Sequence, residues 1–149
     1  MLRSRLTCSV ALMSALLGFA PAGTRSAEEE VIKIISAEQI RSLLTGMGLE
    51  FRQIDDRTFR FELDGFKVFL FHTESDCQLY SGFKDDCDAP KINSWNRTKR
   101  FSRAYLDGEG DPCLEADLDF EGGVTRESFR EFVKTFRISV RSFAKYVRG

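Results

Sequence analysis

Three carboxylates alternate along one short segment of the second half of the chain. Glu115, Asp117 and Asp119 are each separated by one residue, and alternate side chains of a β-strand share one face, so all three would point the same way. Such a row could bind a metal ion or supply an acid and a base for hydrolysis. We expect Arg103 to neutralise part of the row, which favours a charged outer face of a sheet. A metal-binding or hydrolytic domain that uses these acids is the alternative.

Other reactive residue types form no recognisable site in the sequence. Asp107, Glu109 and Asp111 resemble the opening of a calcium-binding loop, but Pro112 stands where Gly is needed and Leu118 where the bidentate Glu belongs. There is one histidine, and the sequence contains neither a G-x-S-x-G nor a C-x-x-C motif. The sequence therefore predicts no catalytic residues, no metal site and no cofactor.

The first 22 residues match a secretory signal peptide. Arg3 and Arg5 precede an apolar run from Leu6 to Phe19, and Ala20-Pro21-Ala22 offers a cleavage site of small residues. The apolar run is short for a membrane span, which needs about 20 residues. We expect cleavage after Ala22, a periplasmic or secreted protein, and no membrane attachment after cleavage. An uncleaved membrane anchor is the alternative.

Export would place the cysteines in an oxidising compartment. Cys77, Cys87 and Cys113 remain once the signal peptide is removed. A Cys77–Cys87 bridge would close a loop of about ten residues and contribute roughly 3 kcal/mol in the chain-entropy model. We predict this pair as a candidate disulfide. Three separate buried thiols, or a redox-active pair, are the alternatives.

The bulk composition is that of one globular domain without a general affinity for nucleic acids. The chain has 149 residues, of which 42% are hydrophobic and 30% charged, and its formal net charge is -1 at pH 7. Trp95, Phe101 and Tyr105 do lie among basic residues, as in a surface that stacks bases. However, we expect Trp95 in the core, and the acids that follow would repel phosphates. We therefore expect no nucleic-acid partner.

Hydrophobic periodicity predicts three helices. The first begins at Ser36, and Gln39 follows three residues later, which is typical of a capping box. The second spans roughly residues 89–98, with Pro90 in its first turn. The third follows Thr125 as its N-cap and carries a continuous apolar stripe. This stripe consists of Phe129, Phe132, Val133, Phe136, Val140, Phe143, Ala144 and Val147.

Alternating patterns predict antiparallel strands. Asp64-Gly65 separates two aromatic-rich runs, which is a strong hairpin signal. Pairing Leu63 with Phe66 gives one core-facing row of apolar residues. The other face then carries Phe69 and Phe71, which need a cover or a partner.

A second hairpin is expected around residues 108–110, and its apolar alternation sets a register. Leu106 would oppose Leu114, and Arg103 would oppose Asp117. Residues 51–54 and 78–84 are further strand candidates. Hairpin connections imply an antiparallel sheet.

These elements predict an α+β fold of order α-β-β-β-α-β-β-α, with three or four strands between the first two helices. The expected architecture is an antiparallel sheet of five to six strands with helices packed on it. We assign residues 1–22 to the signal peptide, 23–35 to an N-terminal tether with a short lead-in at its end, and 36–149 to a single domain.

The segment from Ile92 to Val133 resembles the signature region of the YbjN family, a group of proposed bacterial sensory transduction regulators. The resembling features are Asn93-x-Trp95-Asn96, Phe101, Ala104, Tyr105, the turn from Asp107 to Pro112, the acidic strand from Glu115 to Asp119, and Gly122-Gly123-Val124. The resemblance implies a fold similar to type III secretion chaperones, which are small α+β domains that bind other proteins, and it carries no catalytic motif. Cytoplasmic regulation is the usual expectation for such a family, and the predicted signal peptide departs from it.

The leading hypothesis is a non-enzymatic periplasmic protein, regulatory or chaperone-like, that works in sensory or stress responses. It would bind another protein, or a second copy of itself as a homodimer, through its sheet. A contiguous exposed apolar patch usually marks such a contact. The candidate contact residues are Phe69, Phe71, Arg103 and Tyr105.

Overall fold

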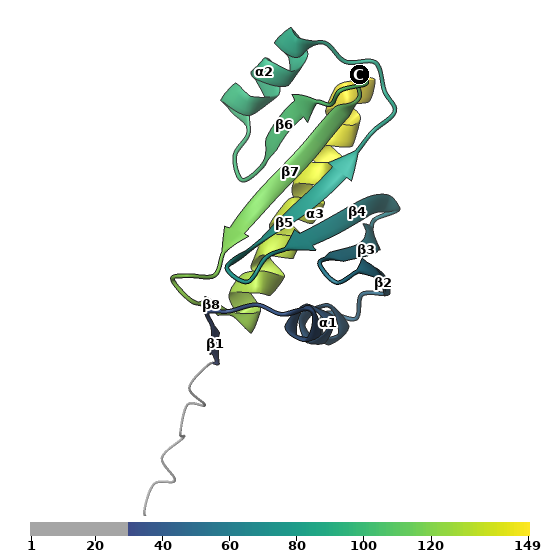
Figure 1. The fold of residues 1–149 in the computed structure, drawn as a ribbon. Helices are drawn as coiled ribbons and strands as arrows, with labels where there is room; N and C mark the ends of the chain where they lie inside the picture. Colours follow the sequence, from purple (N-terminus) through teal and green to yellow (C-terminus); the bar gives the residue numbers. More distant parts are fainter. Residues whose placement is uncertain (1–29) are drawn as a thin grey trace, which may run out of the picture.

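The computed structural model describes residues 30–149 (Figure 1), so the predicted signal peptide and residues 23–29 of the predicted tether lie outside the described residues. The elements are β1 (Val31–Ile32), α1 (Ala37–Gly46), β2 (Phe51–Asp55), β3 (Thr58–Leu63), β4 (Phe66–His72), β5 (Asp76–Gly82), α2 (Ala89–Thr98), β6 (Arg103–Leu106), β7 (Pro112–Asp119), β8 (Val124–Thr125) and α3 (Arg126–Arg148). Within residues 30–149 no helix combines the length and the apolar character that a membrane crossing requires.

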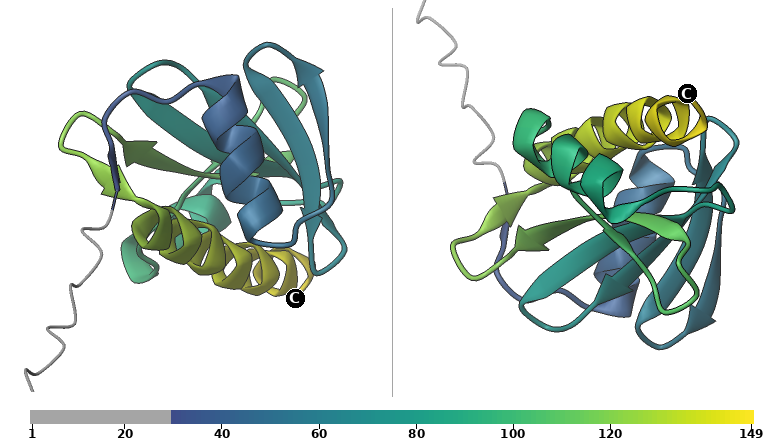
Figure 2. Two further views of the ribbon diagram at one scale, coloured as in Figure 1. Left: turned by 90° about the horizontal axis from the view of Figure 1, so that it is seen from below. Right: turned by 90° about the horizontal axis from the view of Figure 1, so that it is seen from above.

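Six strands form one antiparallel sheet in the order β2-β3-β4-β5-β7-β6, and β1 pairs with β8 in a separate two-stranded sheet. The three helices lie on the same side of the six-stranded sheet (Figures 1 and 2). The core lies between them, where Phe129, Phe136 and Phe143 of α3 are fully buried with Phe59 and Leu70 of the sheet. The predicted α+β class with an antiparallel sheet of five to six strands is confirmed.

The helices begin at the residues that the sequence predicts. The Ser36 hydroxyl accepts a hydrogen bond from the Gln39 amide, and the Gln39 side chain accepts one from the Ser36 amide, which completes the capping box of α1. Thr125 caps α3 in the same way by accepting from the Ser128 amide. Asp88, which precedes the predicted second helix, caps α2. An N-cap of this kind contributes about 1 kcal/mol to stability.

The first hairpin has the predicted register. Leu63 pairs with Phe66, and Asp64 and Gly65 form the turn with φ angles of 52° and 82°. Both angles are positive, as a two-residue turn that follows the twist of the strands requires. Arg137 and Arg141 of α3 bind the Asp64 carboxylate, so the turn is tied to the helix beneath the sheet.

The predicted register of the second hairpin is wrong by two residues. Arg103 pairs with Glu115, not with Asp117, and Leu106 pairs with Pro112 instead of Leu114. The loop is shorter than expected because Asp107 closes it: its amide donates to the Asp111 carbonyl at 2.9 Å, and its carboxylate accepts from the Glu109 and Asp111 amides at 2.9 Å. A shift of two residues keeps every side chain on its predicted face.

Residues 31–35, the predicted lead-in, pair with and pack against the rest of the fold. Val31 and Ile32 pair with Thr125 and Val124. Ile32 and Ile35 are buried, with 4% and 1% of their surface exposed. The ordered contacts of the domain therefore begin in the short lead-in before residue 36, and the two short strands of this pair add to the predicted elements.

Candidate protein-binding surface

The side of the six-stranded sheet that faces away from the helices carries all four predicted contact residues. We call this side the open face. Strand pairing places one line of outward residues across all six strands, because each residue is the direct partner of the next. In strand order this line consists of Arg52, Arg60, Phe69, Tyr80, Glu115 and Arg103.

The four predicted residues fall into two groups on the open face. Phe69 and Phe71 of β4 lie together, with ring centroids 6.1 Å apart and planes only 7° from parallel. Arg103 and Tyr105 lie on β6, at the far edge, and the Arg103 guanidinium is 5.9 Å from the Tyr105 ring centroid. Three strand spacings separate β4 from β6, which is about 14 Å. The structure therefore does not bring the two groups into contact.

Tyr80 of β5 completes an aromatic cluster that the sequence reasoning missed. Its ring centroid lies 6.4 Å from that of Phe69 and 6.3 Å from that of Phe71. Phe71 is 39% exposed, and the other two rings are half-buried. The alternation of the predicted strand 78–84 was the available signal, because it places Tyr80 on the outward side. We call Phe69, Phe71 and Tyr80 the aromatic cluster.

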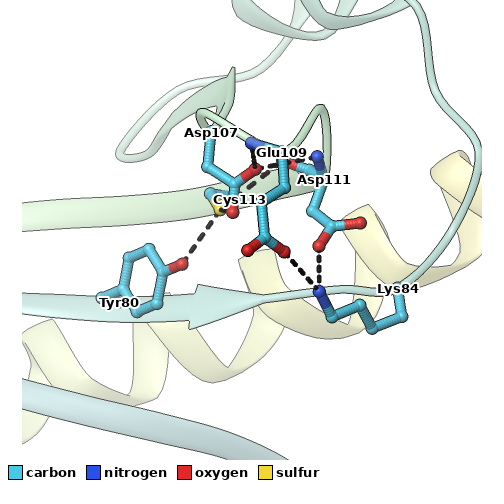
Figure 3. A network of polar contacts seen from close by, with 6 residues as sticks. All are labelled: Tyr80, Lys84, Asp107, Glu109, Asp111 and Cys113. Carbon is cyan, nitrogen blue, oxygen red and sulfur yellow. Dashed lines mark hydrogen bonds and ion pairs between the residues drawn. The ribbon is translucent and has the colours of Figure 1, made fainter.

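Two neighbours define the position of the Tyr80 hydroxyl. It lies 3.0 Å from the Cys113 sulfur on the adjacent strand β7 (Figure 3). A Cβ atom on Gly82 would lie only 2.9 Å from the same hydroxyl, so the glycine provides the space that the ring occupies. Burial, followed by the hydrogen bond to Cys113, raises the pKa of Tyr80 well above its ordinary value, so the phenol is neutral at physiological pH.

The predicted acidic row lies on the open face, but each of its members has a partner within the protein. Glu115 is only 3% exposed and forms an ion pair with Arg103. The Asp117 carboxylate accepts a hydrogen bond from the side-chain amide of Gln78 at 2.9 Å, and the Asp119 carboxylate accepts one from a backbone amide in the following turn. Among residues 30–149 no group of three or more His, Cys, Asp or Glu side chains is arranged to hold a metal ion.

The β6–β7 loop is fastened to the end of the sheet beside this row (Figure 3). Lys84, just beyond β5, forms ion pairs with Glu109 and Asp111 of the loop. A hollow of about 310 Å³ lies on the open face between this loop and Lys67 and Phe69 of β4. Tyr80 also lines it, so the hollow borders the aromatic cluster.

The predicted Cys77–Cys87 disulfide is wrong, because both residues are free thiols. Cys77 is the second residue of β5 and is fully buried on the helix side of the sheet, whereas Cys87 lies beyond the other end of that strand. The extended backbone from Cys77 to Gly82 alone spans about 17 Å, and a disulfide requires Cα atoms within about 7 Å. Cys113 is also a free thiol, and burial raises the pKa of the Cys77 thiol.

Several motif residues in the second half of the chain have structural roles. Trp95 of α2 is 1% exposed, and its ring centroid lies 4.9 Å from that of Phe143 on α3. The Asn96 side chain accepts from the Ala104 amide and donates to the Ala104 carbonyl, both at 2.9 Å. The Asn96 side chain thus forms the hydrogen bonds with the edge of β6 that a neighbouring strand would otherwise form. Asn93 of the same helix is exposed.

The paired glycines after β7 differ in their surroundings. Gly123 has a φ of 91°, and a Cβ atom there would overlap a methyl group of Val31 on β1. Gly122 has no atom within 4 Å of the equivalent position. Only the second glycine is therefore required by the approach of β1 to this turn.

The fold and the open face define a class of small α+β domain in which the helices cover one side of an antiparallel sheet. A model of the YbjN family, described as "Putative bacterial sensory transduction regulator", matches residues 36–148. The chain therefore belongs to the YbjN family. No curated protein matches the sequence.

Two solved structures share the fold. One is YbjN from E. coli, described as "a putative transcription regulator", with a TM-score of 0.57 and 19% identity over 72% of this chain and 90% of that chain. The other is the Yersinia pestis type III secretion chaperone SycH, solved in complex with a stable fragment of YscM2. It has a TM-score of 0.54 and 13% identity over 70% of this chain and 96% of that chain. The predicted similarity to type III secretion chaperones is confirmed for the fold.

Proposed function

We propose that this chain is a non-enzymatic periplasmic regulatory protein that binds a protein partner through the aromatic cluster on its open face. One observation carries the proposal: three aromatic rings lie side by side on a sheet face that no helix covers within residues 30–149. Aromatic residues dominate the energy of many protein interfaces because they bury large areas with little loss of side-chain entropy.

Two further observations support it. The acids of the open face have partners within the protein, so they are poorly suited to act as a metal site or an acid–base pair. SycH, which shares the fold, was crystallised with a fragment of another protein. The periplasmic location rests on the predicted signal peptide alone.

Site-specific photocross-linking in the producing bacterium tests the contact. A photoreactive amino acid at Gln78, which lies on the open face beside Phe71 and Tyr80, is expected to cross-link one partner. The same group at Ile138, which is 66% exposed on α3, is the control for the helix side. Replacement of Phe69 and Phe71 by alanine should abolish the Gln78 cross-link while the thermal midpoint stays within a few degrees.

An unchanged cross-link in the Phe69→Ala/Phe71→Ala variant would exclude the aromatic cluster as the contact. A cross-linked product with twice the mass of the chain would identify a second copy as the partner. Osmotic-shock fractionation with N-terminal sequencing tests the location separately, and we expect the released protein to begin at Gly23.

A further inference from the structure

Three cations on the β2–β4 side of the open face form no ion pair among the described residues. Arg52, Arg60 and Lys67 are all exposed, and their side chains form neither an ion pair nor a hydrogen bond within residues 30–149. On the β5–β7 side of the same face, Glu115 forms an ion pair, and Asp117 and Asp119 accept hydrogen bonds. The cations of the open face that form no ion pair therefore lie on β2–β4, beside the aromatic cluster, whereas Asp117 and Asp119 on β7 accept only from neutral groups and remain charged.

Two of these cations are placed against each other. Arg52 and Arg60 are direct cross-strand partners on β2 and β3. Like charges in this position destabilise a sheet. The carboxylate on the same face of β3 is Glu62, whose direct partner on β4 is Lys67. The arginine pair therefore weakens the isolated fold, whereas carboxylates from a bound partner would remove the repulsion.

Apolar surface adjoins the cations. Phe69 is the direct partner of Arg60 on the next strand, so an arginine and an aromatic ring of the cluster are neighbours. Ile54 of β2 is 48% exposed. The hollow of about 310 Å³ beside Lys67, Phe69 and Tyr80 could accommodate one apolar side chain of a partner.

We propose that the partner segment bound by the open face is acidic and carries an aromatic or aliphatic anchor. Its carboxylates pair with Arg52, Arg60 and Lys67, and its anchor packs against the aromatic cluster. This inference rests on the proposed function and deepens it, because it states the chemistry of the partner. The acids on β7 of the same face favour an acidic segment that lies over β2–β4.

Binding of defined polymers to the mature full chain tests the proposal. The probe is a fluorescent random copolymer of glutamate and tyrosine, measured by anisotropy. Polyglutamate without tyrosine and a lysine–tyrosine copolymer are the comparison probes. We expect the glutamate–tyrosine copolymer to bind most tightly, and its binding to weaken when salt is raised from about 0.05 to about 0.5 M, because salt screens exposed charges.

The matched variants are Arg52→Gln/Arg60→Gln and, as a control at the C-terminal end of α2 and just beyond it, Arg97→Gln/Arg100→Gln. The first is expected to bind the glutamate–tyrosine copolymer about fivefold more weakly with an unchanged or raised thermal midpoint. The control should bind as the unmodified chain does. A loss of affinity together with a raised midpoint would distinguish a binding role of the arginines from a structural one.

The charge assignment is overturned if the unmodified chain fails to bind the glutamate–tyrosine copolymer, if the arginine variant binds it equally well, or if the lysine–tyrosine copolymer or a single-stranded DNA oligonucleotide binds as tightly. Persistence of the Gln78 cross-link in the arginine variant, with its loss in Phe69→Ala/Phe71→Ala, would overturn the charge assignment alone. Persistence in both variants would overturn the proposed function as well.

Discussion

At the scale of single residues, two glycines are important because they have no Cβ atom. Gly82 leaves the space in which the Tyr80 hydroxyl reaches Cys113, and Gly123 leaves the space into which β1 inserts. The sequence marks both glycines only as breaks in a pattern. Which of Gly122 and Gly123 is required cannot be read from it, because the answer depends on Val31, a residue far away along the chain.

Replacement of Gly123 by alanine is expected to destabilise the domain by about 1–3 kcal/mol, because alanine disfavours a positive φ and its Cβ atom would overlap Val31. Gly122→Ala is the matched control and should change stability by less than about 0.5 kcal/mol, as surface substitutions do. Urea unfolding followed by circular dichroism measures both. Equal effects of the two substitutions would contradict the assigned role of Gly123.

At the scale of elements, local sequence signals predict the helices and the buried face of each strand well, and they predict the register of strand pairs less well. The caps at Ser36 and Thr125 and the Asp64-Gly65 turn involve residues close in sequence, so the sequence contains the whole signal. The register of the β6–β7 hairpin depends on how the Asp107 carboxylate folds the loop. Apolar alternation repeats every two residues, so it fixes the face of a strand but cannot separate registers that differ by two.

The attachment of α2 to the edge of β6 depends on Asn96. Asn96→Ala removes both hydrogen bonds to Ala104 and should cost about 2 kcal/mol, because two part-buried backbone groups lose their partner. Asn93→Ala is the control on an exposed site of the same helix. Hydrogen exchange should show faster exchange of the Ala104 amide in the first variant only. An unaffected Ala104 amide would show that the Asn96 side chain is not what protects this edge of β6.

At the scale of the whole molecule, the fold class and the covered side of the sheet follow from the sequence, and the pairing of β1 with β8 does not. The α3 stripe and the strand alternation predict one apolar core and place Phe69 and Phe71 outside it. The segment before Ser36 is too short to show a period, and its strand partner β8 lies far away along the sequence. The disulfide prediction failed for a related reason, because closeness in sequence says little when an extended strand separates two residues.

Two neighbouring isoleucines test how much the segment before α1 contributes to the core. Ile35 is 1% exposed and Ile34 is 69% exposed. Ile35→Ala should destabilise the domain by about 3 kcal/mol through the cavity that it leaves, and Ile34→Ala should have little effect. Thermal and urea unfolding of both variants in the mature chain measure the difference. Similar stabilities would mean that the segment before α1 contributes nothing to the core.

The Asn96 contact has a consequence in any host that attaches sugars to Asn-x-Thr sequences. Asn96-Arg97-Thr98 matches that acceptor pattern. In the folded chain the Asn96 amide nitrogen is directed at the Ala104 carbonyl, and the Thr98 hydroxyl donates to the Ser94 carbonyl. Oligosaccharide transfer must therefore precede the docking of α2. The glycosylated fraction would report how quickly α2 docks against β6 in the newly made chain.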